Sequence, residues 1–209
     1  MRKKIIIALV SLLVLILVFV GIVALQPTDF RITRSATFNA PRAVVFSQVD
    51  DFHNWQAWSP WAKLDPAAKN TFEGPASGKG ASFKWSGNDE IGEGKMTVLE
   101  SRPSELISIK LEFIRPFEDT STTDFTFVGA DDETVVTWSM TGKHNFISKA
   151  MCLFMNMDKM VGDDFEKGLG QMKVISEKQA KSEASKAQDG AKSKDADQKT
   201  AEPEAKKQD

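Results

Sequence analysis

The chain opens with one long apolar run. Residues Ile5 to Leu25 are uncharged and almost wholly aliphatic. A helix rises about 1.5 Å per residue, so about 20 such residues cross the roughly 30 Å hydrocarbon layer of a bilayer. We predict a transmembrane helix over residues 5–25, which would tether the chain to a membrane, and a short spacer over residues 26–29.

The residues around this run predict its orientation. Arg2, Lys3 and Lys4 precede it. By the positive-inside rule, residues 1–4 then stay in the cytoplasm and the residues after the helix lie across the membrane. In a Gram-negative bacterium that side is the periplasm. Arg31 and Arg34 weaken that bias. A cleaved signal peptide is the alternative, but its apolar core is about 7–15 residues long. The longer run therefore favours an anchor.

Alternating apolar and polar positions dominate the segment after the spacer. Phe30, Ile32, Ala36 and Phe38 alternate with polar residues, which predicts a strand with one buried face. Asn39-Ala40-Pro41 is typical of a helix start, and the tryptophan-rich segment 52–61 predicts a second, short helix. Six further strands are predicted at 71–73, 81–85, 94–100, 106–114, 122–128 and 134–140. Short turns between them favour antiparallel pairing.

The last predicted element is a helix over Phe146 to Ile175, with an apolar stripe at helical spacing. Residues 176–209 then contain no aromatic residue and no aliphatic residue larger than alanine. Such a segment buries too little apolar surface to offset its ordering entropy, so we predict a disordered charged tail. A docking segment for a partner is the alternative. The foldable part, residues 30–175, is thus one α+β domain.

Charge and candidate chemistry exclude several function classes. A net charge of −2 gives nucleic-acid binding no electrostatic support, and Cys152, the only cysteine, can form no intrachain disulfide. The two histidines, His53 and His144, lack a metal-ligand spacing. The glycines of segment 74–80 lack the phosphate-loop pattern. We therefore predict no catalytic residue, no metal site and no cofactor.

Several motifs together make a family resemblance specific. They are Asn39-Ala40-Pro41, Trp55-x-x-Trp58-Ser59-Pro60-Trp61, Gly80-Ala81-x-Phe83-x-Trp85, Gly94-Lys95-Met96-Thr97, Thr134-x-Val136-x-Trp138-x-Met140-x-Gly142 and Gly162-x-Asp164-Phe165-Glu166-Lys167-Gly168-Leu169. With them, the chain resembles the SRPBCC superfamily, the START-like group that includes polyketide cyclase/dehydrase-type proteins. The resemblance implies a helix-grip fold, in which a curved antiparallel sheet of about seven strands wraps around the long C-terminal helix.

The resemblance also implies an apolar cavity between that helix and the concave sheet. Strand alternation and the helical stripe place these residues in the cavity or in the core beside it: Phe83, Trp85, Ile109, Leu111, Phe113, Phe125, Phe127, Trp138, Met140, Phe154, Val161, Phe165 and Leu169. Our first hypothesis is a membrane-anchored module that binds a hydrophobic small molecule or lipid. An enzyme similar to the cyclases or dehydratases, and an interaction domain with a filled interior, are the alternatives.

Overall fold

The computed structural model describes residues 2–130 and 132–200, with side chains up to residue 188. Its elements are α1 (Arg2–Ala24), β1 (Asp29–Phe38), α2 (Arg42–Asp50), α3 (Trp55–Trp58), β2 (Lys69–Glu73), β3 (Ser82–Ser86), β4 (Glu93–Arg102), β5 (Leu106–Arg115), β6 (Asp119–Val128), β7 (Thr134–Lys143), α4 (Phe146–Cys152) and α5 (Met157–Thr200). The predicted α+β fold class is confirmed.

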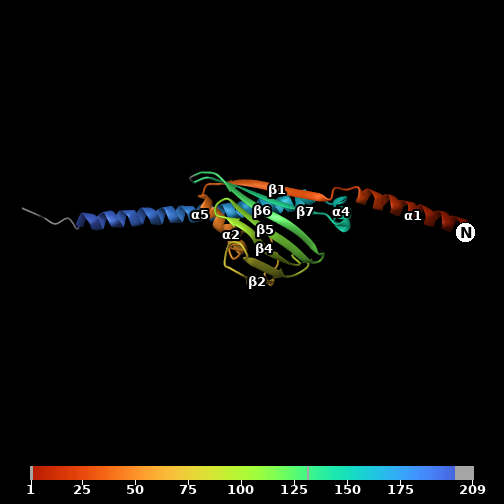
Figure 1. The fold of residues 1–209 in the computed structure, drawn as a ribbon, viewed down its shortest axis with the longest axis horizontal. Coiled ribbons are helices and arrows are strands. Elements are labelled where there is room, and N and C mark those ends of the chain that lie inside the picture. Colours follow the sequence, from red (N-terminus) through yellow and green to blue (C-terminus); the bar gives the residue numbers. More distant parts are fainter. Residues whose placement is uncertain (1, 131, 201–209) are drawn as a thin grey trace, which may run out of the picture.

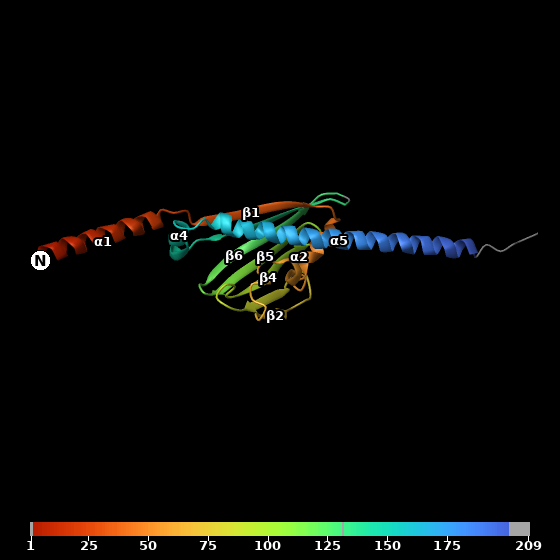
Figure 2. The same ribbon diagram turned by 180° about the vertical axis from the view of Figure 1, so that it is seen from behind.

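All seven strands form one antiparallel sheet in the order β1-β7-β6-β5-β4-β3-β2. Strands β2 to β7 follow one another as neighbours, and β1 joins the far edge by pairing with β7. The sheet curves, and the first half of α5 lies along its concave side (Figures 1 and 2). The alternation seen in the sequence gives the sheet one buried face. On β6, for example, Ser121, Thr123, Phe125 and Phe127 are buried while their neighbours are more exposed.

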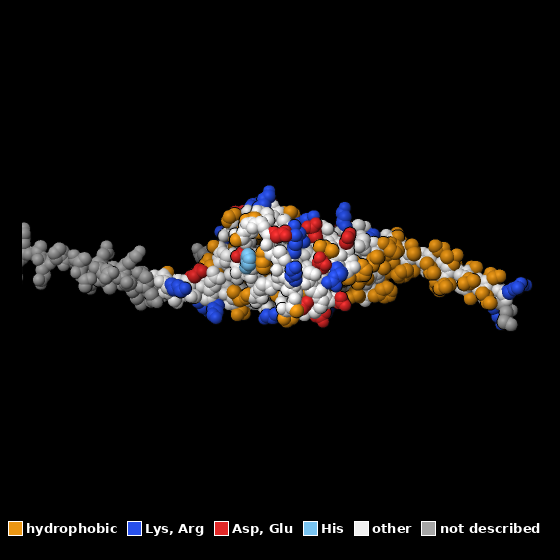
Figure 3. Space-filling model, turned by 90° about the horizontal axis from the view of Figure 1, so that it is seen from below, with side chains coloured by type: hydrophobic (Ala, Val, Ile, Leu, Met, Phe, Trp, Pro, Cys, Tyr) orange, Lys and Arg blue, Asp and Glu red, His pale blue; other side chains and the backbone are white. Residues whose placement is uncertain are grey.

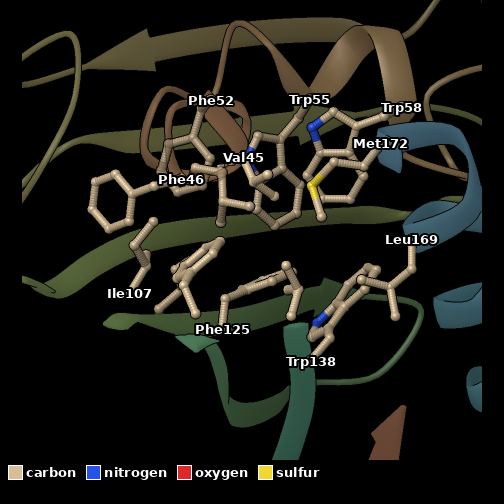
Figure 4. Packing of buried hydrophobic residues seen from close by; sticks show 14 of the residues in the cluster. Val45, Phe46, Phe52, Trp55, Trp58, Ile107, Phe125, Trp138, Leu169 and Met172 are labelled. Atoms are coloured by element: carbon tan, nitrogen blue, oxygen red, sulfur yellow. Dashed lines mark hydrogen bonds between the residues drawn. The ribbon is translucent and has the colours of Figure 1, made fainter. Parts of the chain in front are cut away.

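The core lies where α2 and α3 cover the middle of the sheet. Trp55 and Trp58 are 3% and 0% exposed, and they contact Phe125 and Trp138 edge-on (Figure 4). Their indole N–H groups donate to the carbonyl oxygens of Val49 and Gln48, each at 2.9 Å. Both rings therefore enter the core without an unpaired donor, which a buried indole requires.

The C-terminal region differs from the single helix predicted over residues 146–175. It forms two helices, α4 and α5, separated at Leu153–Asn156. Two asparagines set the starts, since the Asn145 side chain accepts from the backbone N–H of Ser148, and Asn156 accepts from that of Lys159. These are N-cap contacts, and they divide a stripe whose periodicity is continuous.

The predicted disordered tail is also corrected in its first part. Helix α5 continues past Ile175 to Thr200. Ser176 is buried, Gln179 accepts from Gln48 Nε2 at 2.9 Å, and Glu177 accepts from the backbone N–H of Asn39 at 2.8 Å. Polar contacts to α2 and to the residues just before it thus extend the packed part of α5. The segment that follows is rich in Ala, Lys, Glu and Gln, which favours continuation of the helix. Residues 201–209 of the predicted tail lie outside the described part of the chain.

Helix α1 extends away from the domain, and its main contact is with α4 (Figure 1). It is long and apolar enough to cross a membrane, a test that an N-terminal signal sequence also passes. Val23 is the one buried residue of α1, between Arg2 and Ala24.

Candidate ligand cavity

A cavity of about 350 Å³ lies between the concave face of the sheet, the segment after α3, and α5. Most of its lining is apolar, contributed by Trp55, Trp61, Ala62, Ala68, Phe83, Trp85, Ile91, Met96, Leu111, Phe113, Trp138, Met140, Met160, Val161 and Phe165. Its polar lining is Gln56, Ser59, Asp65, Asn70, Glu90, Thr123 and Asp164. A space of this size and composition suits an apolar ligand of modest size.

Strand and helix periodicity aim the side chains into this space. Strands contribute residues two apart on one face, such as Phe83 with Trp85 and Leu111 with Phe113. Helix α5 contributes Val161 and Phe165, four residues apart on one face. The cavity is thus formed by side chains from strands β2 to β7 and from helices α3 and α5, which the fold holds in fixed positions.

Trp138 forms the central aromatic wall. Its ring stacks on Phe165 with centroids 3.9 Å apart and planes 7° apart, and on Phe125 with centroids 4.7 Å apart. The indole Nε1 donates to Thr123 Oγ1 at 2.8 Å, and that hydroxyl donates to the Ser139 carbonyl oxygen at 3.1 Å. These polar atoms bond to one another, so this wall presents mainly aromatic surface.

Trp85 lines the cavity nearer the β3–β4 turn. Its Nε1 donates to the carbonyl oxygen of Ile91 at 2.9 Å, and its ring meets Phe113 edge-on with centroids 6.0 Å apart. The ring lies over Gly94 on β4, where a β-carbon would overlap two ring carbons. The glycine therefore makes room for the indole.

Three carboxylates line the cavity, and two of them are engaged elsewhere. Asp65 accepts from the backbone N–H groups of Ala67 and Asn88, at 3.0 and 2.7 Å. Asp164 accepts from Lys167 Nζ at 2.8 Å, and this hydrogen bond raises the pKa of Lys167 above its ordinary value. Glu90 is exposed. Within the described residues, no group of three His, Cys, Asp or Glu side chains is placed to hold a metal ion.

Neither histidine lines this cavity. His53 Nδ1 lies 2.7 Å from Asp51 Oδ1, and its ring stacks on Phe72 with centroids 4.0 Å apart. His144 stacks on Phe30 with centroids 4.6 Å apart, and its Nε2 lies 3.7 Å from the sulfur of Cys152. Both rings have local packing partners.

The residues proposed from the sequence separate into three groups. Phe83, Trp85, Leu111, Phe113, Trp138, Met140, Val161 and Phe165 line the cavity. Ile109, Phe125, Phe127 and Leu169 are buried at 0–2% exposure in the adjoining core. Phe154 lies outside both, 79% exposed after α4. Sequence reasoning missed Met96 and Trp61, although the alternation of Met96 with Val98 on β4 was a usable signal.

A second cavity of about 630 Å³ lies at the end of the domain next to α1. Its walls come from β1, from the β5–β6 end of the sheet, from α4 and from the start of α5. Phe113, Met140 and Val161 line both cavities. The two spaces are therefore neighbours that share part of one wall.

Arg34 fastens α5 to the edge strand β1. Its guanidinium donates to Glu166 Oε1 at 3.0 Å, to Asp158 Oδ2 at 3.1 Å and to the Asp158 carbonyl oxygen at 3.0 Å. The hydrogen bond with Asp158 is the main reason that the pKa of Arg34 is raised. Gly162 allows this contact, because a β-carbon there would overlap the guanidinium.

A curved antiparallel sheet that grips one long helix over an apolar cavity defines a helix-grip domain. A family model described as polyketide cyclase/dehydrase and lipid transport matches residues 29–177. The chain belongs to this family, which confirms the resemblance seen in the sequence.

Solved structures show the same fold at low sequence identity. A protein from Mesorhizobium loti has a TM-score of 0.52 and 14% identity over 70% of this chain and 96% of its own. The Aha1 dimer from Colwellia psychrerythraea has a TM-score of 0.51 and 13% identity over 71% of this chain and 96% of its own. Both likenesses concern the fold alone. No curated protein matches the chain.

Proposed function

We propose that the protein is a membrane-anchored binding module that holds a hydrophobic or lipid-like small molecule in the central cavity. In this proposal residues 5–25 span the membrane with residues 1–4 in the cytoplasm, and the domain lies on the other side. The description of the family includes lipid transport, which agrees with such a ligand.

The apolar lining of the cavity is the observation that carries the proposal. Aromatic and aliphatic side chains from β3, β4, β5, β7 and α5 surround it, and the Trp138 and Thr123 polar groups bond to each other. A negatively charged ligand would lose its hydration there without a Lys, Arg or His side chain to pair with among the described residues of the lining, which is costly. An apolar ligand instead gains about 25 cal/mol for each Å² it removes from water.

The anchor supports the same class of ligand. A poorly soluble molecule partitions into the bilayer, and a domain tethered to that bilayer meets it at a high effective concentration. A freely diffusing domain would gain no such advantage.

Two alternatives have less support. A cyclase- or dehydratase-like enzyme needs an acid or base directed at its substrate. Asp65 and Asp164 hold backbone and lysine partners instead, and Glu90, the third carboxylate of the lining, is exposed. A purely interaction-based domain needs a filled interior, whereas this domain contains a cavity.

Mass spectrometry of the full chain, purified in a mild detergent, tests the proposal. Wild-type protein should carry co-purified apolar mass that organic solvent extracts. Leu111→Trp should lose most of that mass because Leu111 lines the cavity, while Leu99→Trp, at a position 44% exposed on β4, should keep it. Wild-type protein without bound apolar molecules, which also takes up none from added lipid, would refute the proposal.

A further inference from the structure

The domain's end next to α1 exposes many apolar side chains. Helix α4 contains no buried residue. Exposed apolar residues on and around it are Phe146 (49%), Ile147 (53%), Met151 (40%), Phe154 (79%) and Met155 (38%), with Ile114 (52%) and Phe117 (56%) at the β5–β6 turn. Hydrophobic surface continues from α1 onto this end of the domain (Figure 3). A soluble protein rarely leaves such a patch uncovered.

The contact between α1 and α4 fixes the depth of this patch. The rings of Phe19 and Phe154 stack with centroids 6.4 Å apart. Phe19 lies five residues before Ala24, the last residue of α1, which is about 7.5 Å along a helix axis. When α1 spans the bilayer, as in the proposed function, Phe154 lies at the depth of Phe19. It is then inside the bilayer and not at the surface where α1 leaves it.

The second cavity joins this patch to the central one. Met151, Leu153, Phe154 and Met155 form its wall on the α4 side. On the inner side it shares Phe113, Met140 and Val161 with the central cavity. A path from the level of the bilayer to the proposed binding site therefore leads through the second cavity, whose lining also contains Arg31, Asp119, His144 and Asp158, and past the three shared side chains.

We propose that α4 and the turn after it dip into the bilayer and that the second cavity is the entrance through which the acyl chain of a membrane lipid reaches the central cavity. This inference rests on the proposed function and names its ligand class, a lipid taken from the membrane that holds α1. The occupant of the exposed patch is the bilayer itself.

The bilayer fits this surface because of its continuity with α1 and because of its charge. Lys149 is the only charged residue of α4, and Arg31 is an exposed basic residue among those lining the second cavity. The acidic residues of that lining are Asp158, which is paired with Arg34, and Asp119. Basic side chains beside an apolar face are typical of helices that lie in the lipid headgroup region.

Brominated lipid tests the route, because bromine quenches tryptophan on contact. The chain has five tryptophans, and Trp55, Trp61, Trp85 and Trp138 line the central cavity. Full-length protein is reconstituted in phosphatidylcholine vesicles, and phosphatidylcholine with brominated acyl chains is then delivered from cyclodextrin. Wild-type fluorescence should fall about two-fold as the acyl chain becomes enclosed by the cavity.

The variants separate the entrance from the binding site. Phe154→Asp places a charge at the apolar entrance and should slow quenching about tenfold while reaching the wild-type end point. The control is Val128→Asp, which also changes an exposed apolar residue, since Val128 is 66% exposed. Val128 is at one end of β6, and Asp119, which lines the second cavity, is at the other end. Val128 lies about 30 Å along the strand, so this variant should quench at the wild-type rate.

Each outcome decides one of the two proposals. Absence of quenching in the wild-type protein refutes an acyl lipid as the ligand of the central cavity. Quenching of Phe154→Asp at the wild-type rate, or equal slowing of both variants, overturns the proposal that the second cavity is the entrance. The proposal that the central cavity is the binding site is then unaffected.

Discussion

The hydrogen bond between Trp138 and Thr123 offers a sharp test of how dry the cavity wall is. Thr123→Val keeps the branched shape of the side chain but replaces its hydroxyl with a methyl group. The indole N–H of Trp138, now bonded at 2.8 Å, then loses its acceptor, while Trp138 itself is only 2% exposed. The hydroxyl's own bond to the Ser139 carbonyl oxygen is lost as well.

The expected cost follows from burial of an unpaired donor. Leaving a buried donor without a partner costs about 1–3 kcal/mol. For a domain of the size matched by the family model, residues 29–177, 1 kcal/mol corresponds to about 2–4 °C in Tm. We therefore expect Thr123→Val to lower Tm by about 4–8 °C, taking about 2 kcal/mol as the central value.

Thermal unfolding of the full chain in detergent, followed by tryptophan fluorescence, measures this change. All five tryptophans lie between residues 55 and 138, so the signal reports on the domain and not on α1. The control is Thr137→Val, the same change at the residue before Trp138, where the hydroxyl pairs with Ser35 Oγ at 2.8 Å on the exposed side. That variant should shift stability by less than about 0.5 kcal/mol.

Equal effects of the two variants would refute the reasoning. A loss below about 0.5 kcal/mol for Thr123→Val would mean that the indole finds another partner, such as water. The wall of the central cavity would then be wetter than the proposed apolar ligand requires.

Two further changes test the packing and the charges around the cavity. Gly94→Ala should destabilise the domain by about 1–3 kcal/mol, because the new β-carbon would overlap the Trp85 ring and lie 2.6 Å from a backbone carbonyl oxygen of β5. The control is Gly170→Ala, which has open space at its β-carbon. It should be neutral or stabilising in the same unfolding assay. The hydrogen bond from Lys159 lowers the pKa of Asp163 below its ordinary 3.8, so its contribution to stability is complete above pH 3.8 and is lost as the pH falls through the lowered pKa. Asp163→Asn should therefore reduce Tm at pH 7 and not below that pKa, and a constant difference across pH would contradict this assignment.

The sequence predicted the sheet well because strand alternation is a local signal. Residues two apart on β5, Ile107 and Ile109, are both fully buried as their pattern required, and turn residues marked each change of direction. The helix break after Cys152 was missed because the apolar stripe crosses it without interruption. The Asn156 cap was visible in the sequence, but its weak local preference could not be ranked against that stripe.

The candidate site was predictable in part, for a related reason. Side chains on regular strands, such as Trp85 and Leu111, follow from periodicity, but periodicity does not separate a cavity wall from a filled core. Ile109 and Leu111 lie on the same face of one strand, yet only Leu111 lines the cavity. The second cavity depends on contacts between residues more than a hundred positions apart, such as Phe30 and His144, which no local pattern contains.

The two C-terminal helices are held to the domain with very different strength. Helix α5 buries Phe165, Leu169 and Met172 and is fastened by the Arg34 contacts to β1, whereas α4 buries no side chain. Local opening is cheapest where least apolar area is buried, so the domain should open at α4 long before α5 moves. That is the end that faces the membrane in our proposal, and a lipid could enter there while the sheet and α5 keep the central cavity intact.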